Sequence, residues 1–259
     1  MPSLFLTSLP PDPRSAQALL AALKPYGLAV QGRLWADDLE RMAWLGPAEV
    51  LRHPDTALWL VAGSAGDWAA PTVRYGLALL ALKVQAARGA NFPFILVNTS
   101  ADPLDPQSLP DPFRGAAMIP AGHPQLGAKV TAAAHLPVAP AEVEYRLEVH
   151  AAPGLGTWFE VGPAAGSWSG ALFGVDGGRI DAHGVGPRGL LPHKAVLKYP
   201  QKGIVLRLEE REFTAWAVRN VISAGESYYL RVWDLPAQIL FGPYDPAGDD
   251  LDLHRVRLQ

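Results

Sequence analysis

The pattern of apolar and polar positions changes near residues 137–140 of this chain. Before this point, short apolar runs alternate with stretches in which apolar residues recur at helical spacing. After it, apolar and polar residues alternate with period two, and glycine or proline interrupts the pattern every few residues, as in strands joined by turns. The change predicts two domains, an α/β domain over residues 1–137 and a β domain over residues 141–259.

The first half is predicted to form a doubly wound parallel sheet with helices on both faces. Its five strands are expected at residues 4–8, 28–35, 57–62, 92–98 and 116–120. The first helix is expected to end at Gly27, a second to cover residues 37–42, and a third to run from Pro71 to Gly89. Because strands and helices alternate, right-handed crossovers predict the strand order 2-1-3-4-5.

The second half is predicted to form a mainly antiparallel β domain, either a sandwich or a small barrel. Its strands are expected at residues 145–150, 157–161, 168–175, 195–199, 203–208, 212–218, 228–233 and 239–241. The sequence Asp176-Gly177-Gly178 indicates a hairpin turn, because both turn positions favour positive φ angles.

Three segments of the first half resemble the Toll/interleukin-receptor (TIR) family, or a relative in the wider flavodoxin-like group. Residues 4–8 resemble its Phe-Ile-Ser-Tyr-like first strand, residues 57–64 its third strand, which ends in a serine, and residues 72–77 the start of the next helix. NAD-cleaving members carry a glutamate on that helix, whereas the aligned residue here is Gly76. The resemblance therefore implies a TIR-like domain that makes protein contacts and lacks this activity.

Charge and composition narrow the function further. The chain has 22 Lys and Arg against 25 Asp and Glu, so neither a basic field nor a nucleic-acid partner is expected. It has no cysteine, which excludes disulfides and thiolate metal sites. No apolar run has the length of a membrane span and the first residues lack a signal-peptide pattern, so we expect a cytoplasmic protein with no membrane partner. Abundant Ala, Gly, Pro and Leu are typical of a bacterium with a GC-rich genome.

A ligand of the first half is expected beyond the carboxyl ends of its strands. Ser8 and Ser64 follow two of these strands, and the start of the helix at Pro71 offers free N–H groups to an anion. Arg74 in its first turn adds a second group for phosphate or carboxylate. Asp67 opposes this interpretation, since it is able to pair with Arg74 or to cap this same helix. The hypothesis is a weak anion or nucleotide site rather than a catalytic one.

The other candidate metal-binding and catalytic residues lack the sequence spacing that such sites require. Asp176, Asp181, His183 and His193 are close in sequence, but a cupin-like metal site uses two histidines one residue apart and then a glutamate. We interpret this segment as an exposed hairpin, and expect no metal ion, no cofactor and no catalytic residue. The acidic group Glu209, Glu210 and Glu212 is interpreted as a charged strand edge. The serines considered as nucleophiles, none in a Gly-x-Ser-x-Gly elbow, are Ser64, Ser167, Ser169, Ser223 and Ser227.

Two features of the second half suggest recognition. Gly178-Arg179 and the segment 192–197 around His193 are similar to the spacing of forkhead-associated phosphothreonine-binding domains, although the serine of that pattern has no match. Tryptophan is frequent at strand positions, where it usually packs in the core, but two rings exposed on one side would favour a binding surface. These tryptophans are Trp158, Trp168, Trp216 and Trp233.

Taken with the missing glutamate, these features favour a non-catalytic bacterial adaptor with a protein partner. One alternative is an enzyme that processes a nucleotide or NAD in the α/β crevice. Another is a phosphopeptide-binding β domain.

Overall fold

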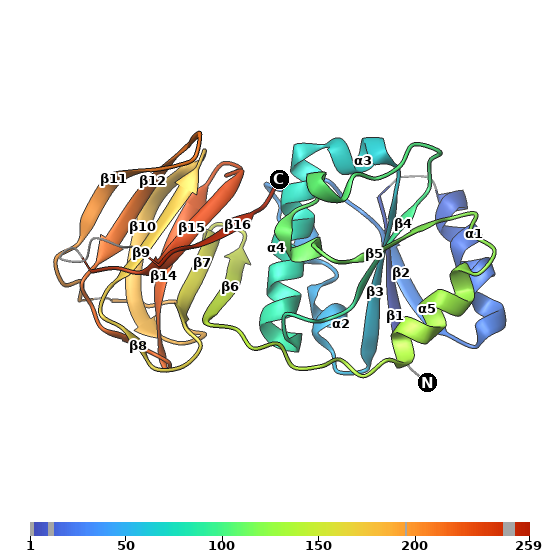
Figure 1. Cartoon of the computed structure of the whole chain (residues 1–259), viewed down its shortest axis with the longest axis horizontal. Helices are drawn as coiled ribbons and strands as arrows, with labels where there is room; N and C mark the ends of the chain where they lie inside the picture. Colours follow the sequence, from blue (N-terminus) through green and yellow to red (C-terminus); the bar gives the residue numbers. More distant parts are fainter. Residues whose placement is uncertain (1–2, 10–12, 195, 246–251) are drawn as a thin grey trace. The chain divides into compact units, whose positions relative to one another are not determined.

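The computed structural model of the chain describes residues 3–9, 13–194, 196–245 and 252–259 (Figure 1). These residues belong to two compact units, Met1–Ala141 and Glu142–Gln259. The first combines a sheet with helices, and the described part of the second consists of strands and loops. No helix in the described part of the chain is long and apolar enough to cross a membrane.

The sheet of the first unit has five parallel strands in the order β2-β1-β3-β4-β5, which confirms the predicted doubly wound order. The central strands are buried on both faces, which explains their continuous apolar runs. The edge strand β2 is mostly exposed. The strands are β1 (Ser3–Ser8), β2 (Ala29–Leu34), β3 (Thr56–Gly63), β4 (Phe94–Asn98) and β5 (Ala117–Pro120).

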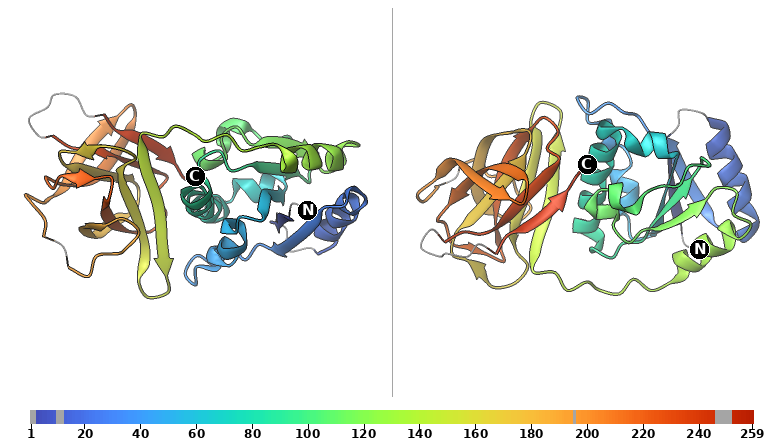
Figure 2. Two further views of the ribbon diagram at one scale, coloured as in Figure 1. Left: turned by 90° about the horizontal axis from the view of Figure 1, so that it is seen from below. Right: turned by 45° about the horizontal axis from the view of Figure 1, so that its top comes forward.

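Helices cover both faces of this sheet, with α1 and α5 on one face and α4 on the other (Figures 1 and 2). Leu23 of α1 and Val130 of α5 belong to one buried cluster with Leu60 of β3. Helix α4 is buried along most of its length. The α-helices are α1 (Pro13–Leu23), α2 (Ala48–Arg52), α3 (Ala65–Ala69), α4 (Pro71–Arg88) and α5 (Leu126–His135). The 3₁₀ turns are η1 (Lys24–Tyr26), η2 (Ala43–Leu45), η3 (Pro106–Ser108) and η4 (Asp111–Phe113).

The helix predicted over residues 37–42 is wrong, because this segment forms turns. The Asp38 carboxylate accepts a hydrogen bond from the backbone N–H of Arg41 at 2.9 Å, which closes a local turn in place of a helical bond. Met42 then adopts a left-handed conformation with a φ angle of 53°. The acidic residues that suggested a helix start therefore stabilise a turn.

The second unit consists mainly of two antiparallel sheets, with the strand orders β10-β14-β7-β6 and β11-β12-β9-β15-β16. They pack through aromatic side chains, as the rings of Phe159 and Phe173 lie 5.5 Å apart, so the unit is a sandwich. A short pair, β8 with β13, completes it. The strands are β6 (Tyr145–Ala152), β7 (Gly156–Pro163), β8 (Ser167–Trp168), β9 (Ala171–Asp176), β10 (Arg179–Pro187), β11 (Gln201–Leu208), β12 (Arg211–Val218), β13 (Ile222–Ser223), β14 (Glu226–Trp233), β15 (Gln238–Pro243) and β16 (His254–Arg257).

The predicted hairpin after Asp176 is wrong, although its turn residues behave as expected. Gly177 and Gly178 have φ angles of 72° and 75°. However, β9 pairs with β12 and β15, whereas β10 pairs with β14. The turn thus carries the chain from one sheet to the other. The segment that follows, interpreted as an exposed hairpin, is the nine-residue strand β10.

Two further strand predictions need correction. Residues 168–175 belong to two strands, β8 and β9, which are separated by Ser169 and Gly170. A Cβ built on Gly170 would collide with the carbonyl oxygen of Tyr244, so this position has room for glycine alone. Residues 196–199 are a loop, and Ala195 lies outside the described residues. In this loop the side chain of Asn220 bonds to the N–H of Lys198 and the carbonyl of Val196, in place of a strand partner.

Candidate functional site

The predicted anion site of the α/β unit is largely occupied by its own side chains. Ser64 caps helix α3, and its Oγ accepts a hydrogen bond from the N–H of Asp67 at 3.1 Å. The Asp67 carboxylate accepts from the backbone N–H and the Oγ of Ser64 at 2.7 and 2.6 Å. This is a capping box, in which each residue satisfies the other. Asp67 therefore belongs to the cap of α3, and among the described residues it forms neither of the predicted alternatives, a pair with Arg74 or a cap of the helix at Pro71.

Ser8 and Arg74 are not joined to this pair by a hydrogen bond or an ion pair among the described residues. The Ser8 Oγ is buried without a partner in the described part of the chain, and so is the Nε of Arg74. At the start of α4, the Thr72 hydroxyl donates to the carboxylate of Asp37 at 2.6 Å. A negative charge thus already lies at this helix start, which disfavours a second anion there.

Position 76, where the TIR-like alignment places a glutamate, has no space for a side chain. A Cβ built on Gly76 would lie 2.9 Å from Cζ2 of Trp35 and 3.2 Å from a methyl carbon of Leu39. Real Cβ atoms essentially never come within 3.0 Å of such a ring atom. The close packing of helix α4 on the segment after β2 explains why this helix carries glycine here.

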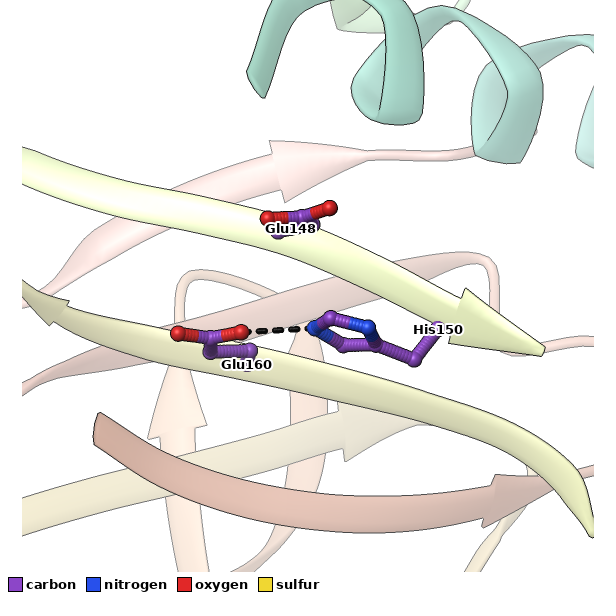
Figure 3. A group of neighbouring side chains, drawn as sticks. All are labelled: Glu148, His150 and Glu160. Carbon is purple, nitrogen blue, oxygen red and sulfur yellow. Dashed lines mark hydrogen bonds and ion pairs between the residues drawn. The ribbon is translucent and has the colours of Figure 1, made fainter. Parts of the chain in front are cut away.

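A polar cluster that sequence reasoning missed lies on one face of the four-stranded sheet of the β unit. Period-two alternation places Arg146, Glu148 and His150 on the same face of β6. Glu148 lies directly opposite Glu160 of β7 in the strand register. Tyr229 of β14 lies opposite Glu160 on its other side. Figure 3 shows the imidazole of His150 directed at the Glu160 carboxylate.

Glu160 is the centre of this cluster and is 2% exposed. Its Oε2 lies 2.6 Å from Nε2 of His150. Its Oε1 accepts hydrogen bonds from the Ser227 hydroxyl at 2.6 Å and from the N–H of Gly189 at 3.0 Å. Burial by itself raises the pKa of Glu160, but these hydrogen bonds outweigh it, so the pKa lies below its usual value. The buried carboxylate is therefore ionised at neutral pH.

Arg146 completes the charge balance around Glu160. Its Nη1 lies 3.6 Å from Oε1 of Glu160 and donates to Ser227 Oγ at 3.0 Å. Its Nη2 approaches the position where Gly162 would carry a Cβ, at 2.6 Å, so glycine makes room for the guanidinium. Ser227 donates to a carboxylate and not to a histidine, which is the wrong order for a Ser-His-acid nucleophile. The arrangement is therefore not that of a serine hydrolase.

Glu148, His150 and Glu160 form a group of metal-ligand type. One donor atom from each lies within 4.8 Å of the others. Glu148 is half-buried, and among the described residues its carboxylate has no hydrogen-bond or ion-pair partner. The sequence indicates this cluster in one way: Arg146, Glu148 and His150 alternate with apolar residues along a single strand.

A second feature of the same face is a stack of one arginine and two tryptophans. The guanidinium carbon of Arg231 lies 5.5 Å from the ring centre of Trp158 and 5.6 Å from that of Trp233. Asp181 holds the guanidinium with two hydrogen bonds of 2.8 and 3.1 Å. Trp233 remains 37% exposed. Of the four tryptophans predicted in this half, Trp168 is buried and Trp216 stacks under Lys202.

The metal ligands considered from the sequence are not brought together. Asp176 pairs with Arg211, and Asp181 pairs with Arg231. The Nδ1 of His183 bonds to the hydroxyl of Tyr228 at 2.8 Å. His193 is exposed in the loop after β10.

The remaining candidates have structural partners or exposed positions. The hydroxyl of Ser223 donates to Glu226 at 3.0 Å. Glu209 and Glu212 pair with Arg255 and Arg207, and Glu210 is exposed. Arg179, from the phosphothreonine-type pattern, has a side chain that is 62% exposed and lies 3.9 Å from Asp181.

No known family model matches this chain, and no curated protein matches it either. The TIR-like resemblance therefore stays a prediction.

Proposed function

We propose that the chain is a non-catalytic bacterial interaction protein of the cytoplasm, with a TIR-like unit that makes protein contacts and a β unit that recognises a protein partner. The packing at Gly76 carries this proposal. A TIR-type cleavage of NAD requires a glutamate on this helix, and here Trp35 occupies the space that its side chain would need. The capping box of Ser64 and Asp67 supports the proposal, since both side chains are committed to the start of α3.

The β unit supports the recognition part of the proposal. Trp233 is partly exposed beside Arg231 and Trp158, so two tryptophans from different strands form one stack on one sheet face. Aromatic side chains held rigid in this way lose little conformational entropy on binding, which suits a protein interface. The arginine is neutralised by Asp181, so the surface is expected to select apolar or aromatic partner groups.

The experiment that tests the non-catalytic role is incubation of the full chain with NAD and with nucleoside triphosphates, followed by chromatography of the products. We expect no turnover above the buffer control. Turnover that is lost in Arg74→Ala or Asp67→Ala, but kept in the exposed variant Arg41→Ala, would overturn the proposal.

The alternative, a nucleotide-processing enzyme, is favoured by one observation. The Ser8 Oγ and the Arg74 Nε are buried polar atoms without partners in the described part of the chain, and such atoms usually have one. Chemical-shift mapping with nucleotides and with phosphate at millimolar concentration distinguishes the two functions. Shifts confined to residues 64–74 would favour the alternative, whereas their absence would support the interaction role.

A further inference from the structure

We propose that Glu148, His150 and Glu160 form a binding site for a divalent transition-metal ion, with Zn²⁺ as the ion that fits their chemistry. The site goes beyond the interaction role, and its test needs no partner. Two carboxylates and one imidazole are a donor set that zinc accepts, with a fourth position left for water. Magnesium is a poorer match, since it takes oxygen ligands in octahedral geometry.

The first argument is the strand register. Glu148 and Glu160 are directly opposed on β6 and β7, and like charges in this relation destabilise a sheet. Glu160 is compensated by Arg146 and His150, whereas Glu148 has no partner among the described residues. The guanidinium of Arg188 also lies close enough to act on that of Arg146, so the positive charges here are those of two arginines. The group without a partner is Glu148, and a cation bound between the two opposed carboxylates supplies one.

The second argument is that the two carboxylate oxygens of Glu160 have different contacts. Oε1 is held by Ser227 and by the N–H of Gly189, while Oε2 lies 2.6 Å from Nε2 of His150. Metal-binding carboxylates are commonly oriented by hydrogen bonds of this kind to the atom that does not bind the ion. The Oε1 contacts thus fix the carboxylate and leave Oε2 to bind.

The distances allow an ion with small movements. Donor atoms of a tetrahedral zinc site lie about 3.3 Å apart, given metal–ligand bonds of about 2.0–2.1 Å. Here Oε2 of Glu160 and Nε2 of His150 lie 2.6 Å apart, and all three donors lie within 4.8 Å. When the ion binds, a proton on Nε2 of His150 is displaced, to solvent from an imidazolium or to Nδ1 in a neutral ring, so that the imidazole binds in its neutral form. Oε2 and Nε2 then separate from 2.6 Å, and the Glu148 carboxylate moves towards them.

The test is calorimetric titration of the untagged full chain with ZnCl₂ at pH 7.5, with MgCl₂ as the control ion. We expect one zinc per chain, and at least tenfold weaker affinity in Glu148→Gln. Glu148 has no partner to lose in the described part of the chain, so this variant is expected to fold normally. The matched control is Glu144→Gln, an exposed glutamate just before β6, which should bind zinc as the wild-type chain does.

A second measurement separates this site from adventitious binding by other histidines. His53 is an exposed histidine of the α/β unit, 3.6 Å from a carboxylate oxygen of Asp55, and serves as the comparison. Zinc should shift the imidazole NMR signals of His150, and His53→Gln should leave the titration unchanged. No zinc binding, equal binding by Glu148→Gln, or binding that disappears only in His53→Gln would overturn the proposal.

Discussion

Asp67 of the α/β unit and Glu160 of the β unit are held in opposite ways. In the α/β unit, Asp67 bonds to Ser64, three residues away in sequence. In the β unit, Glu160 bonds to partners that are 10, 29 and 67 residues away, namely His150, Gly189 and Ser227. The first arrangement is a local motif of a helix start. The second exists only because strand pairing brings distant segments to one sheet face.

This difference explains why Ser64 and Asp67, which the sequence suggests as ligand-binding residues, are poorer candidates than the cluster around Glu160. A capping box completes itself, so Ser64 and Asp67 have little capacity left for a ligand. A network built from distant segments does not give every nearby charged side chain a hydrogen bond or an ion pair. Glu148 lies beside Glu160 without such a partner among the described residues. A charged side chain without a partner, next to a hydrogen-bonded network, indicates a binding site more strongly than a capping box does.

The largest effect is expected for Glu160→Gln. Loss of the charge leaves Arg146 and the hydrogen-bond donors around it uncompensated in a buried place, so the free energy of unfolding of the β unit should fall by about 3–5 kcal/mol. Hydrogen exchange of peptides from residues 142–259, followed across a urea series, measures this change. The exposed control Glu210→Gln should change it by less than about 0.5 kcal/mol. Equal stability of the two variants would mean that the network is no more important than a surface charge.

The next effect concerns the α/β unit at Gly76. Gly76→Ala places a Cβ 2.9 Å from Trp35, so the ring or the helix must shift, at a cost of about 1–3 kcal/mol. The helix preference of alanine recovers about 1 kcal/mol of this, so the expected net loss is up to about 2 kcal/mol. Gly66→Ala is the matched control, because the nearest atom to its Cβ is Ser64 Oγ at 3.6 Å and alanine favours a helix by about 1 kcal/mol. The midpoint temperature of thermal unfolding should fall in Gly76→Ala and rise in Gly66→Ala. A stable Gly76→Ala chain would show that the crevice has room for a side chain.

The α/β fold was predictable because its signals are local and repeated. Apolar runs of the central strands, Pro71 at a helix start and Gly27 after a helix each act within a few residues. The β unit was predictable only as a set of strands. The glycines of Asp176-Gly177-Gly178 determine a turn, but whether that turn stays within a sheet depends on the partners of β9 and β10.

The polar cluster could not be predicted with the same tools. Glu148 and His150 share a strand face by alternation, which the sequence shows directly. Their relation to Glu160 requires the register of β6 with β7, and that of Ser227 requires the further pairing of β14 with β7. Sequence spacing alone instead suggests Asp181 and His183, which are two positions apart in the chain but have separate partners.

A smaller effect is expected from His183 in the β sandwich, as a dependence of the unfolding free energy on pH. Burial, with a lesser contribution from Lys202, lowers the pKa of His183 to about 4. An unfolded histidine has a pKa of about 6.5, so the unfolded chain binds a proton first as the pH falls. His183 thus contributes stability that is complete above pH 6.5 and is lost as the pH falls towards about 4.

The loss is expected to be about 1–2 kcal/mol after allowance for partial solvent screening. Urea unfolding of the wild-type chain at pH 7 and pH 5 measures it. His183→Gln keeps a polar group near the Tyr228 hydroxyl and removes the titration, so its two unfolding curves should lie closer together. A pH dependence identical to wild type would assign the effect to another group.

The smallest effect is expected for Ser64→Ala, and its size sharpens the comparison between the units. The variant removes the hydroxyl from the capping box but keeps the bond from the backbone N–H of residue 64 to Asp67, so the loss should be about 1 kcal/mol and local to α3. Hydrogen exchange of peptides over residues 60–75 should detect it, and Ser64→Thr, which keeps the hydroxyl, should restore most of the protection. Phosphate titration should give the same chemical shifts in Ser64→Ala and wild type, because a self-contained cap offers no group to the anion. A phosphate affinity that falls with the hydroxyl would instead make Ser64 a ligand-binding residue, and the α/β crevice would then rank with the β sheet as a candidate site.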